Sequence, residues 1–97
     1  MRPKTGAIAI NAKDNVATAL DELPAGTAVS VKTEHGIEKI ELISPIPKGH
    51  KFALRHIDSG GAVIKYGEMI GKSRVEILRG QHVHVHNVVS QPKGETS

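Results

Sequence analysis

Three histidines alternate with two valines in the segment His82-Val83-His84-Val85-His86, the densest group of chemically active side chains in the sequence. Side chains of a strand alternate between its two faces, so this pattern predicts three imidazoles on one face and both valines on the other, toward the core. Neighbours on one face are roughly 6.6–6.8 Å apart, so His84 and His86 could bind one metal ion together, whereas three histidines spanning about 13 Å could not. Such a pair, completed by a ligand from elsewhere, would suit zinc, iron or manganese. The alternative is a solvent-exposed strand face without a ligand.

His50 and Lys51 follow Pro47 and Gly49, directly after an expected turn. Side chains that follow a turn are often well placed to contact a ligand. The tripeptide Gly49-His50-Lys51 is also typical of the exposed tip of a hairpin, which is the alternative interpretation.

An apolar strand is interrupted in the segment Val63–Gly71, where Lys65, Tyr66 and Glu68 stand among apolar residues. Lys65 would hold an anionic group that Tyr66 and Glu68 position. In the alternative, Tyr66 belongs to the core, Lys65 lies on the outer face, and Gly67 marks a bulge or a bend.

Other catalytic signatures are absent from the sequence. There is no cysteine, which excludes disulfides, thiolate catalysis and zinc ribbons. There is also no nucleophile elbow, phosphate-binding glycine loop or carboxylate pair with catalytic spacing. We therefore expect a domain that does not enclose a complete active site by itself.

The chain of 97 residues is of the size of one domain, and its 38% apolar content allows it to fold without disulfides. No stretch approaches the ~20 apolar residues of a membrane span, and the N-terminal sequence lacks the apolar run of a signal peptide. We therefore expect a soluble protein of the cytoplasm that has no membrane partner. The net charge of +3 is mildly basic, but Phe52 and Tyr66 are the only aromatic residues, which argues against binding of nucleic acid.

One pattern recurs four times: an apolar residue, two others, a glycine, two more residues, and then an apolar start to a strand-like run. These turn units, numbered 1 to 4 below, occupy Leu23–Val31, Ile46–Leu54, Ile57–Lys65 and Ile77–Val85. Each glycine stands where a tight turn often requires a positive φ, and the alternation that follows three of them is typical of a half-buried strand. The spacing between the units is irregular, which argues against a solenoid and predicts a small, mainly β domain.

The expected exception to the β structure is a short helix near the N-terminus. Asp14-Asn15 could cap it, and Val16, Leu20 and Leu23 would lie on one of its faces. A hairpin is predicted at Glu34–Gly36. Residues 90–97 and the first five residues are expected to form polar, frayed ends.

Several motifs coincide in chain order: Asp14–Ala17, Ile46–Lys51, Val63–Gly71 and Gly80–Asn87. Together they resemble the N-terminal SAF-type domain of the altronate and galactarate dehydratase family over about residues 8–89. The resemblance implies a small β-clip-like fold and one SAF-type domain over residues 1–97. It also implies that this domain is either a separate small subunit, as in sulfolactate sulfo-lyase, or the N-terminal part of a larger enzyme.

The resemblance implies a subunit that completes a metal-dependent elimination site with a larger catalytic lyase subunit. A proton leaves the carbon α to a carboxylate, and the β substituent departs as water or as sulfite. The substrate is then a sugar acid or a sulfonated hydroxy acid. A divalent metal, Fe²⁺ or Mn²⁺, shared with the large subunit would act as a Lewis acid.

The resemblance singles out eight positions, and the chemistry of their side chains suggests a role for each. Catalysis is expected of His50, His84 and His86, and the last two are also the expected metal ligands. Substrate binding is expected of Lys51, Lys65, Tyr66, Glu68 and Asn87. His82 ranks lower, because the family more often has other residue types there. The chain departs from the family pattern at His56 and Glu76, where an aspartate often stands.

Other classes of function remain open. The chain could be a stand-alone SAF module that binds a carbohydrate or a metal without catalysis, or it could form a homo-oligomer. The sequence does not say which hydroxy acid is used.

Overall fold

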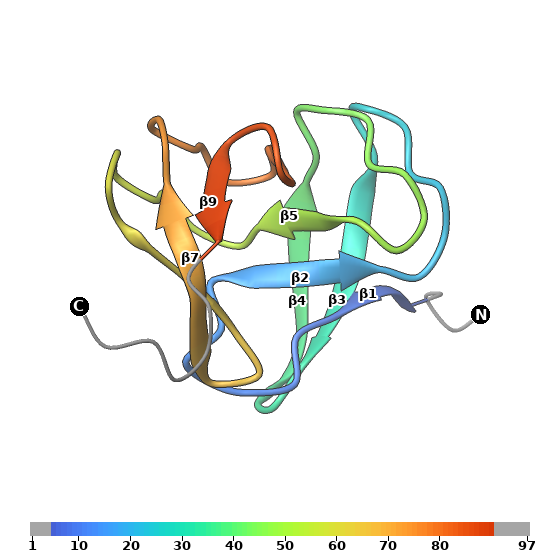
Figure 1. Cartoon of the computed structure of the whole chain (residues 1–97). Helices are drawn as coiled ribbons and strands as arrows, with labels where there is room; N and C mark the ends of the chain where they lie inside the picture. Colours follow the sequence, from blue (N-terminus) through green and yellow to red (C-terminus); the bar gives the residue numbers. More distant parts are fainter. Residues whose placement is uncertain (1–4, 91–97) are drawn as a thin grey trace.

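The computed structural model describes residues 5–90 of the chain (Figure 1). Within this range it contains nine strands and no helix, which confirms the mainly β prediction. The strands are β1 (Thr5–Ile8), β2 (Val16–Ala19), β3 (Ala28–Thr33), β4 (Gly36–Glu41), β5 (Lys51–Ala53), β6 (Ala62–Lys65), β7 (Glu68–Ser73), β8 (His82–Val83) and β9 (Val88–Ser90). No helix that could cross a membrane occurs in the described range.

The strands form two sheets. Six strands pair in the order β4-β3-β1-β2-β5-β8, and three pair in the order β6-β7-β9. All pairs are antiparallel except β1 with β3. Figure 1 shows β7 and β9 on one side of the molecule and β3 on the other, with β5 between them. The predicted hairpin at Glu34–Gly36 is confirmed, since it joins β3 to β4.

All four predicted turns are present. In each turn unit, the residue after the glycine donates its N–H to the carbonyl three residues earlier. The glycines have φ values of 85°, 84°, 82° and 84°, as the third residue of a type II turn requires. They are Gly26, Gly49, Gly60 and Gly80.

The turn units pair two by two. Leu23 of unit 1 exchanges two backbone hydrogen bonds with Ile46 of unit 2, and Ile57 of unit 3 does the same with Ile77 of unit 4. The glycine N–H of each unit also donates to a backbone carbonyl that precedes the partner unit. This carbonyl belongs to the residue four positions before the apolar residue with which the partner unit begins. The second pair of units therefore repeats the bonding of the first. β5 follows the turn of unit 2 and β8 that of unit 4, and these two equivalent strands pair directly with each other.

The predicted N-terminal helix is wrong, because Val16–Ala19 forms strand β2. The β-branched Val16 and Thr18 favour a strand, and the polar residues before them bind distant backbone instead of capping a helix. The Asn15 amide makes two hydrogen bonds of 2.8 Å to the β6 backbone, and Asp14 Oδ1 accepts one of 2.8 Å from Gly67 N–H. These three bonds fasten the segment to the β6–β7 hairpin.

The core consists of two clusters of buried apolar side chains. β5 contributes to both, Phe52 to the larger and Ala53 to the smaller, and Val83 of β8 belongs to the smaller. All three side chains are fully buried. The core therefore holds the two short strands that carry the histidines in a fixed position.

Substituting alanine for Gly80 should destabilise the chain more than the same change at Gly60. Both glycines have a positive φ, which costs an alanine about 1–2 kcal/mol. A Cβ at position 80 would also lie against the backbone oxygen of Glu41, whereas a Cβ at position 60 would meet nothing within 4 Å. Urea denaturation should show a loss near this cost for Gly60→Ala and a larger loss for Gly80→Ala. Equal losses in the free energy of unfolding for the two variants would contradict the close contact between a Cβ at position 80 and the Glu41 oxygen.

Candidate functional site

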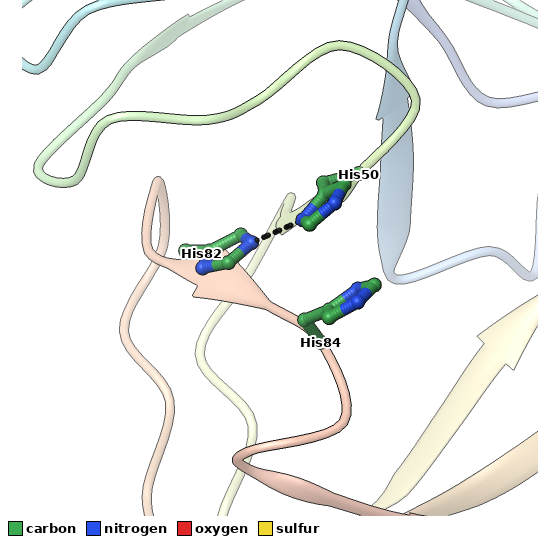
Figure 2. Close-up of side chains that lie close together, drawn as sticks. All are labelled: His50, His82 and His84. Carbon is green, nitrogen blue, oxygen red and sulfur yellow. Dashed lines mark hydrogen bonds between the residues drawn. The ribbon is translucent and has the colours of Figure 1, made fainter.

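Three imidazoles lie together where β5 meets β8 (Figure 2). His50 immediately precedes β5, His82 lies on β8, and His84 follows β8. A hydrogen bond of 2.9 Å joins His50 Nδ1 to His82 Nε2. One ring nitrogen of each residue lies within 4.8 Å of the other two. We call these three residues the imidazole cluster.

The rings of the cluster are stacked. The centroid of His50 is 3.9 Å from that of His84 and 5.1 Å from that of His82, with interplanar angles of 10° and 15°. His86 extends the stack at its edge, with its centroid 5.0 Å from that of His82. Face-to-face contact on this scale restricts the rotation of each ring.

The register of β5 and β8 explains why the cluster forms. The two strands are antiparallel, and Phe52 lies opposite His82. The same antiparallel register sets His50 opposite His84, because His50 lies two residues before Phe52 and His84 lies two residues after His82. Neither segment alone could bring these side chains together. The contact depends on the pairing of β5, which follows the turn of unit 2, with β8, which follows the turn of unit 4.

The predicted strand through residues 82–86 is wrong after Val83, where the chain turns. Asn87 N–H donates to the carbonyl of His84 at 3.1 Å, which closes the turn. Val85 is consequently 72% exposed, although the alternation predicted it in the core. His86 lies on the same turn and is exposed, so the structure groups His84 with His82 and His50 and leaves His86 at the edge of the stack.

Asn87 holds this turn in place. Its Oδ1 accepts a hydrogen bond of 2.9 Å from His84 N–H, and its Nδ2 donates one of 2.8 Å to the carbonyl of His82. The residue is only 3% exposed. Its amide thus positions the backbone of two cluster histidines, and its role as a substrate ligand stays a prediction.

One nitrogen of the cluster has an unusual environment. His84 Nδ1 is buried and has no hydrogen-bond partner within residues 5–90. Leaving a buried polar atom without a partner costs about 1–3 kcal/mol, so such atoms in native structures usually bind an ordered water, an ion or another group. This nitrogen is therefore the best candidate in the cluster for a contact with a bound group.

The electrostatic environment of the cluster is positive. Burial lowers the pKa of His82 and of His84, and the nearby His50, His86 and Lys51 lower both pKa values further. Burial also lowers the pKa of Lys51, as does the nearby ammonium of Lys65. The lysines and histidines that lower these pKa values can carry only a positive charge. The site thus keeps His82 and His84 neutral near pH 7, and the ammonium groups of Lys51 and Lys65 attract an anion.

Lys65, Tyr66 and Glu68 lie at the hairpin that joins β6 to β7. Tyr66 and Gly67 have φ values of 56° and 76°, which is the geometry of a two-residue type I′ turn. Tyr66 is exposed and lies 4.8 Å from the Lys65 ammonium, so the interpretation of Tyr66 as a core residue is wrong. The structure brings Lys65 within electrostatic range of Lys51, and Glu68 pairs with Lys65 in the hairpin.

The sequence interpretation underrated His82. His50 stands four residues after the apolar residue that opens unit 2, and His82 stands five after that of unit 4, so both follow the turn of their unit. The pairing of β5 with β8, which the sequence pattern does not show, brings the two histidines together.

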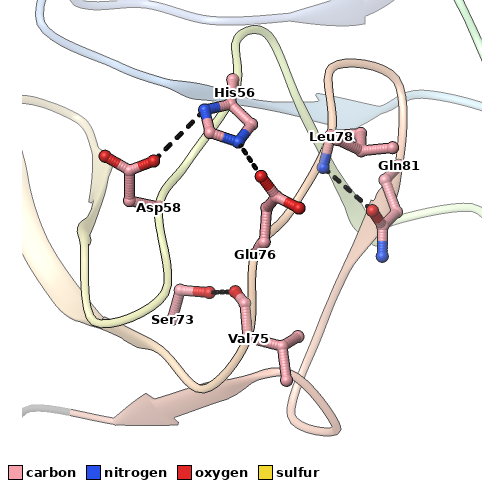
Figure 3. A network of polar contacts seen from close by, with 7 residues as sticks. All are labelled: His56, Asp58, Ser73, Val75, Glu76, Leu78 and Gln81. Atoms are coloured by element: carbon pink, nitrogen blue, oxygen red, sulfur yellow. Dashed lines mark hydrogen bonds and ion pairs between the residues drawn. The ribbon is translucent and has the colours of Figure 1, made fainter.

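A second polar network lies outside the cluster (Figure 3). His56 Nε2 is 2.6 Å from Glu76 Oε2, and His56 Nδ1 is 3.4 Å from Asp58 Oδ1. His56 and Glu76, two of the positions at which the sequence departs from the resembled pattern, thus contact each other. All three side chains are exposed and lie beside the bridge between units 3 and 4, so the network supports this pair of turns.

The stability of the chain should fall as the pH drops below about 6.5, the usual pKa of histidine. The pKa values of His82 and His84 are lowered in the folded chain, so between their folded and unfolded pKa values the unfolded chain binds more protons. The melting temperature should therefore decrease below this pH. The double variant His82→Asn, His84→Asn should show a weaker decrease, whereas an unchanged pH profile would contradict the lowered pKa values.

Comparisons with known proteins place these observations in context. The family model described as the altronate/galactarate dehydratase SAF domain matches residues 5–91. Altronate dehydratase of Escherichia coli (strain K12) is 48% identical over 80 residues, which are 82% of this chain and 15% of that protein. Galactarate dehydratase (L-threo-forming) of the same strain is 38% identical over 84 residues, or 84% of this chain and 15% of that protein.

A shorter relative is the (2R)-sulfolactate sulfo-lyase subunit alpha of Chromohalobacter salexigens. It is 46% identical over 50 residues, which are 52% of this chain and 53% of that subunit. The matched segment therefore spans a small part of the dehydratases and about half of the sulfo-lyase subunit.

Proposed function

Because this chain belongs to the altronate/galactarate dehydratase SAF domain family, we propose that it forms one wall of a hydroxy-acid lyase site that a larger chain completes. It would do so as a separate small subunit or as an N-terminal domain. The observation that carries the proposal is the imidazole cluster, which gathers neutral bases and two lysines in one place. Most of the length of the dehydratase relatives lies outside the matched segment, which supports a larger partner.

The proposed reaction is an elimination from a sugar acid or a sulfonated hydroxy acid. A base removes the proton on the carbon α to the carboxylate, and the C–H electrons form the double bond as the bond to the β substituent breaks. The electrons of that bond leave with hydroxide, which takes up a proton to become water, or with sulfite. Lys51 and Lys65 would hold the carboxylate. Of the predicted catalytic residues, His50 and His84 lie in the cluster, and a neutral imidazole there can accept the proton. The low pKa of His84 keeps it in this form near pH 7.

The residues of the cluster fit a divalent metal such as Fe²⁺ or Mn²⁺, shared with the larger chain. Neutral imidazole is a suitable ligand, and His84 Nδ1 is a buried nitrogen without a partner in the described chain. His82 and one of His50 and His84 would hold the ion together with ligands of the larger chain, which leaves the other imidazole free to accept the proton. The proposal thus replaces the pair of His84 and His86 with residues that lie together. When bound, such an ion supplies Lewis-acid polarisation of the substrate's oxygens.

Co-purification tests the proposal. The tagged full-length chain should recover, in stoichiometric yield from the cytoplasmic fraction of its native cells, a larger chain that resembles the catalytic part of a dehydratase or a sulfo-lyase. The purified pair should eliminate water from altronate or galactarate, or sulfite from sulfolactate. Dialysis against a chelator should abolish the activity, and Fe²⁺ or Mn²⁺ should restore it. Recovery of the folded chain alone would favour a stand-alone binding module, and activity that survives the chelator would remove the metal from the proposal.

A further inference from the structure

Two hollows use the imidazole cluster as part of their walls. The first has a volume of about 450 Å³ and meets the cluster at His82. The second has a volume of about 170 Å³ and meets it at His84 and Lys51. The centroids of these two histidine rings are only 5.7 Å apart, so the hollows are neighbours on either side of the cluster.

The walls of both hollows are largely apolar. Three prolines, Leu23 and Ile46 line the first, with Glu22 at its edge. Ile70, Val85 and Val88 line the second, with Ser90. Val85 is 72% exposed, the largest exposed fraction among the exposed apolar side chains of the described range. Adjacent apolar hollows with an exposed valine are typical of a protein interaction surface.

The charge of this surface indicates the chemistry of its partner. Lys51 lines the second hollow, the ammonium of Lys65 lies close enough to interact with it, and no acidic side chain is among the residues that line this hollow. A partner that brought carboxylates to this point would relieve the repulsion. The complementary occupant is thus an apolar surface that carries acidic side chains near its centre.

We infer that this surface, made of the two hollows and the cluster between them, is where the larger lyase chain docks. The inference rests on the proposed function, since that function supplies the larger chain. Apolar side chains of the larger chain fill the two hollows, and its acidic groups face Lys51 and the imidazoles. Docking there encloses the buried nitrogen of His84 and excludes water from the site.

The test measures the affinity of the full-length chain for the purified larger chain. Val85→Asp places a carboxylate in the second hollow, and Pro45→Glu places one at the first. Each change should raise the Kd at least tenfold. Val75→Asp is the matched control, because Val75 is an exposed valine that lines neither hollow, and it should change the Kd less than twofold. Circular dichroism should show that all three variants are folded.

The outcomes separate the inference from the proposed function. If the unmodified chain binds no larger lyase chain, the proposed function fails. If it binds one and both hollow variants bind equally well, the inference is overturned and the proposed function stands. Sedimentation of the chain alone checks whether a second copy of the chain is the occupant. The inference is also overturned if the chain self-associates, if Val85→Asp and Pro45→Glu abolish this self-association, and if both variants still bind the larger chain.

Discussion

Replacing His84 by alanine should lower the kcat of the reconstituted enzyme by at least about 10²-fold, the lower range for the loss of a general acid or base. His84 combines a lowered pKa with a buried, unpartnered nitrogen, so no other residue of the cluster is as well suited to contact a reacting group. The isolated chain should remain folded, because the side chain of His84 has no hydrogen bond to lose at this nitrogen. Steady-state kinetics of the purified pair, together with thermal melting of the chain, measures both effects.

His86→Ala is the matched control. His86 belongs to the same segment but is exposed at the edge of the stack, so its loss should reduce kcat less than about tenfold. Equal losses for the two variants would support the pair predicted from the sequence instead of the cluster. Full activity of a folded His84→Ala enzyme would exclude His84 from the site.

Replacing Asn87 by alanine should destabilise the isolated chain by about 2–4 kcal/mol. The change removes two hydrogen bonds of a buried side chain and leaves His84 N–H and the carbonyl of His82 without partners, each at a cost of about 1–3 kcal/mol. Urea denaturation measures the free energy of unfolding. Because the turn would loosen, the stacking of His84 on His50 should weaken as well, and the imidazole resonances of both residues in NMR spectra should shift.

Asn11→Ala serves as the control for this change. The Asn11 side chain accepts one hydrogen bond from the exposed Lys13 N–H, so its loss should cost about 0.5–1.5 kcal/mol. If Asn87 acted only as a substrate ligand, Asn87→Ala would raise KM and leave the stability of the isolated chain unchanged. That result would contradict the structural role assigned here.

Local signals allowed most of the fold to be predicted from the sequence. The four turns were predictable because a type II turn needs only a glycine at its third position, a requirement met within four residues. The hairpin at Glu34–Gly36 is equally local. The strands begin at Thr5 and end at Ser90, slightly beyond the domain core of residues 8–89 that the sequence predicts. Residues 91–97, where most of the predicted tail falls, lie outside the described range.

The errors arose where distant contacts decide the local structure. Asp14 and Asn15 have the residue types of a helix cap, but their side chains bind backbone 47 to 53 residues away. The alternation at residues 82–86 indicated a longer strand, but the amide of Asn87 closes a turn there instead. Side-chain periodicity carries no information about such partners. The same limit explains why His50 and His82, 32 residues apart, were not paired in advance.

The repeated bonding of the turn units has an evolutionary consequence. The two residues that follow the turn glycine are equivalent in all four units. They are Thr27-Ala28 in unit 1 and Gly61-Ala62 in unit 3, but His50-Lys51 in unit 2 and Gln81-His82 in unit 4. Tandem duplication of an ancestral half-domain, followed by divergence at two adjacent positions, would produce this arrangement. The reactive side chains lie in the two units whose strands, β5 and β8, pair with each other, whereas units 1 and 3 have smaller residues at the equivalent positions.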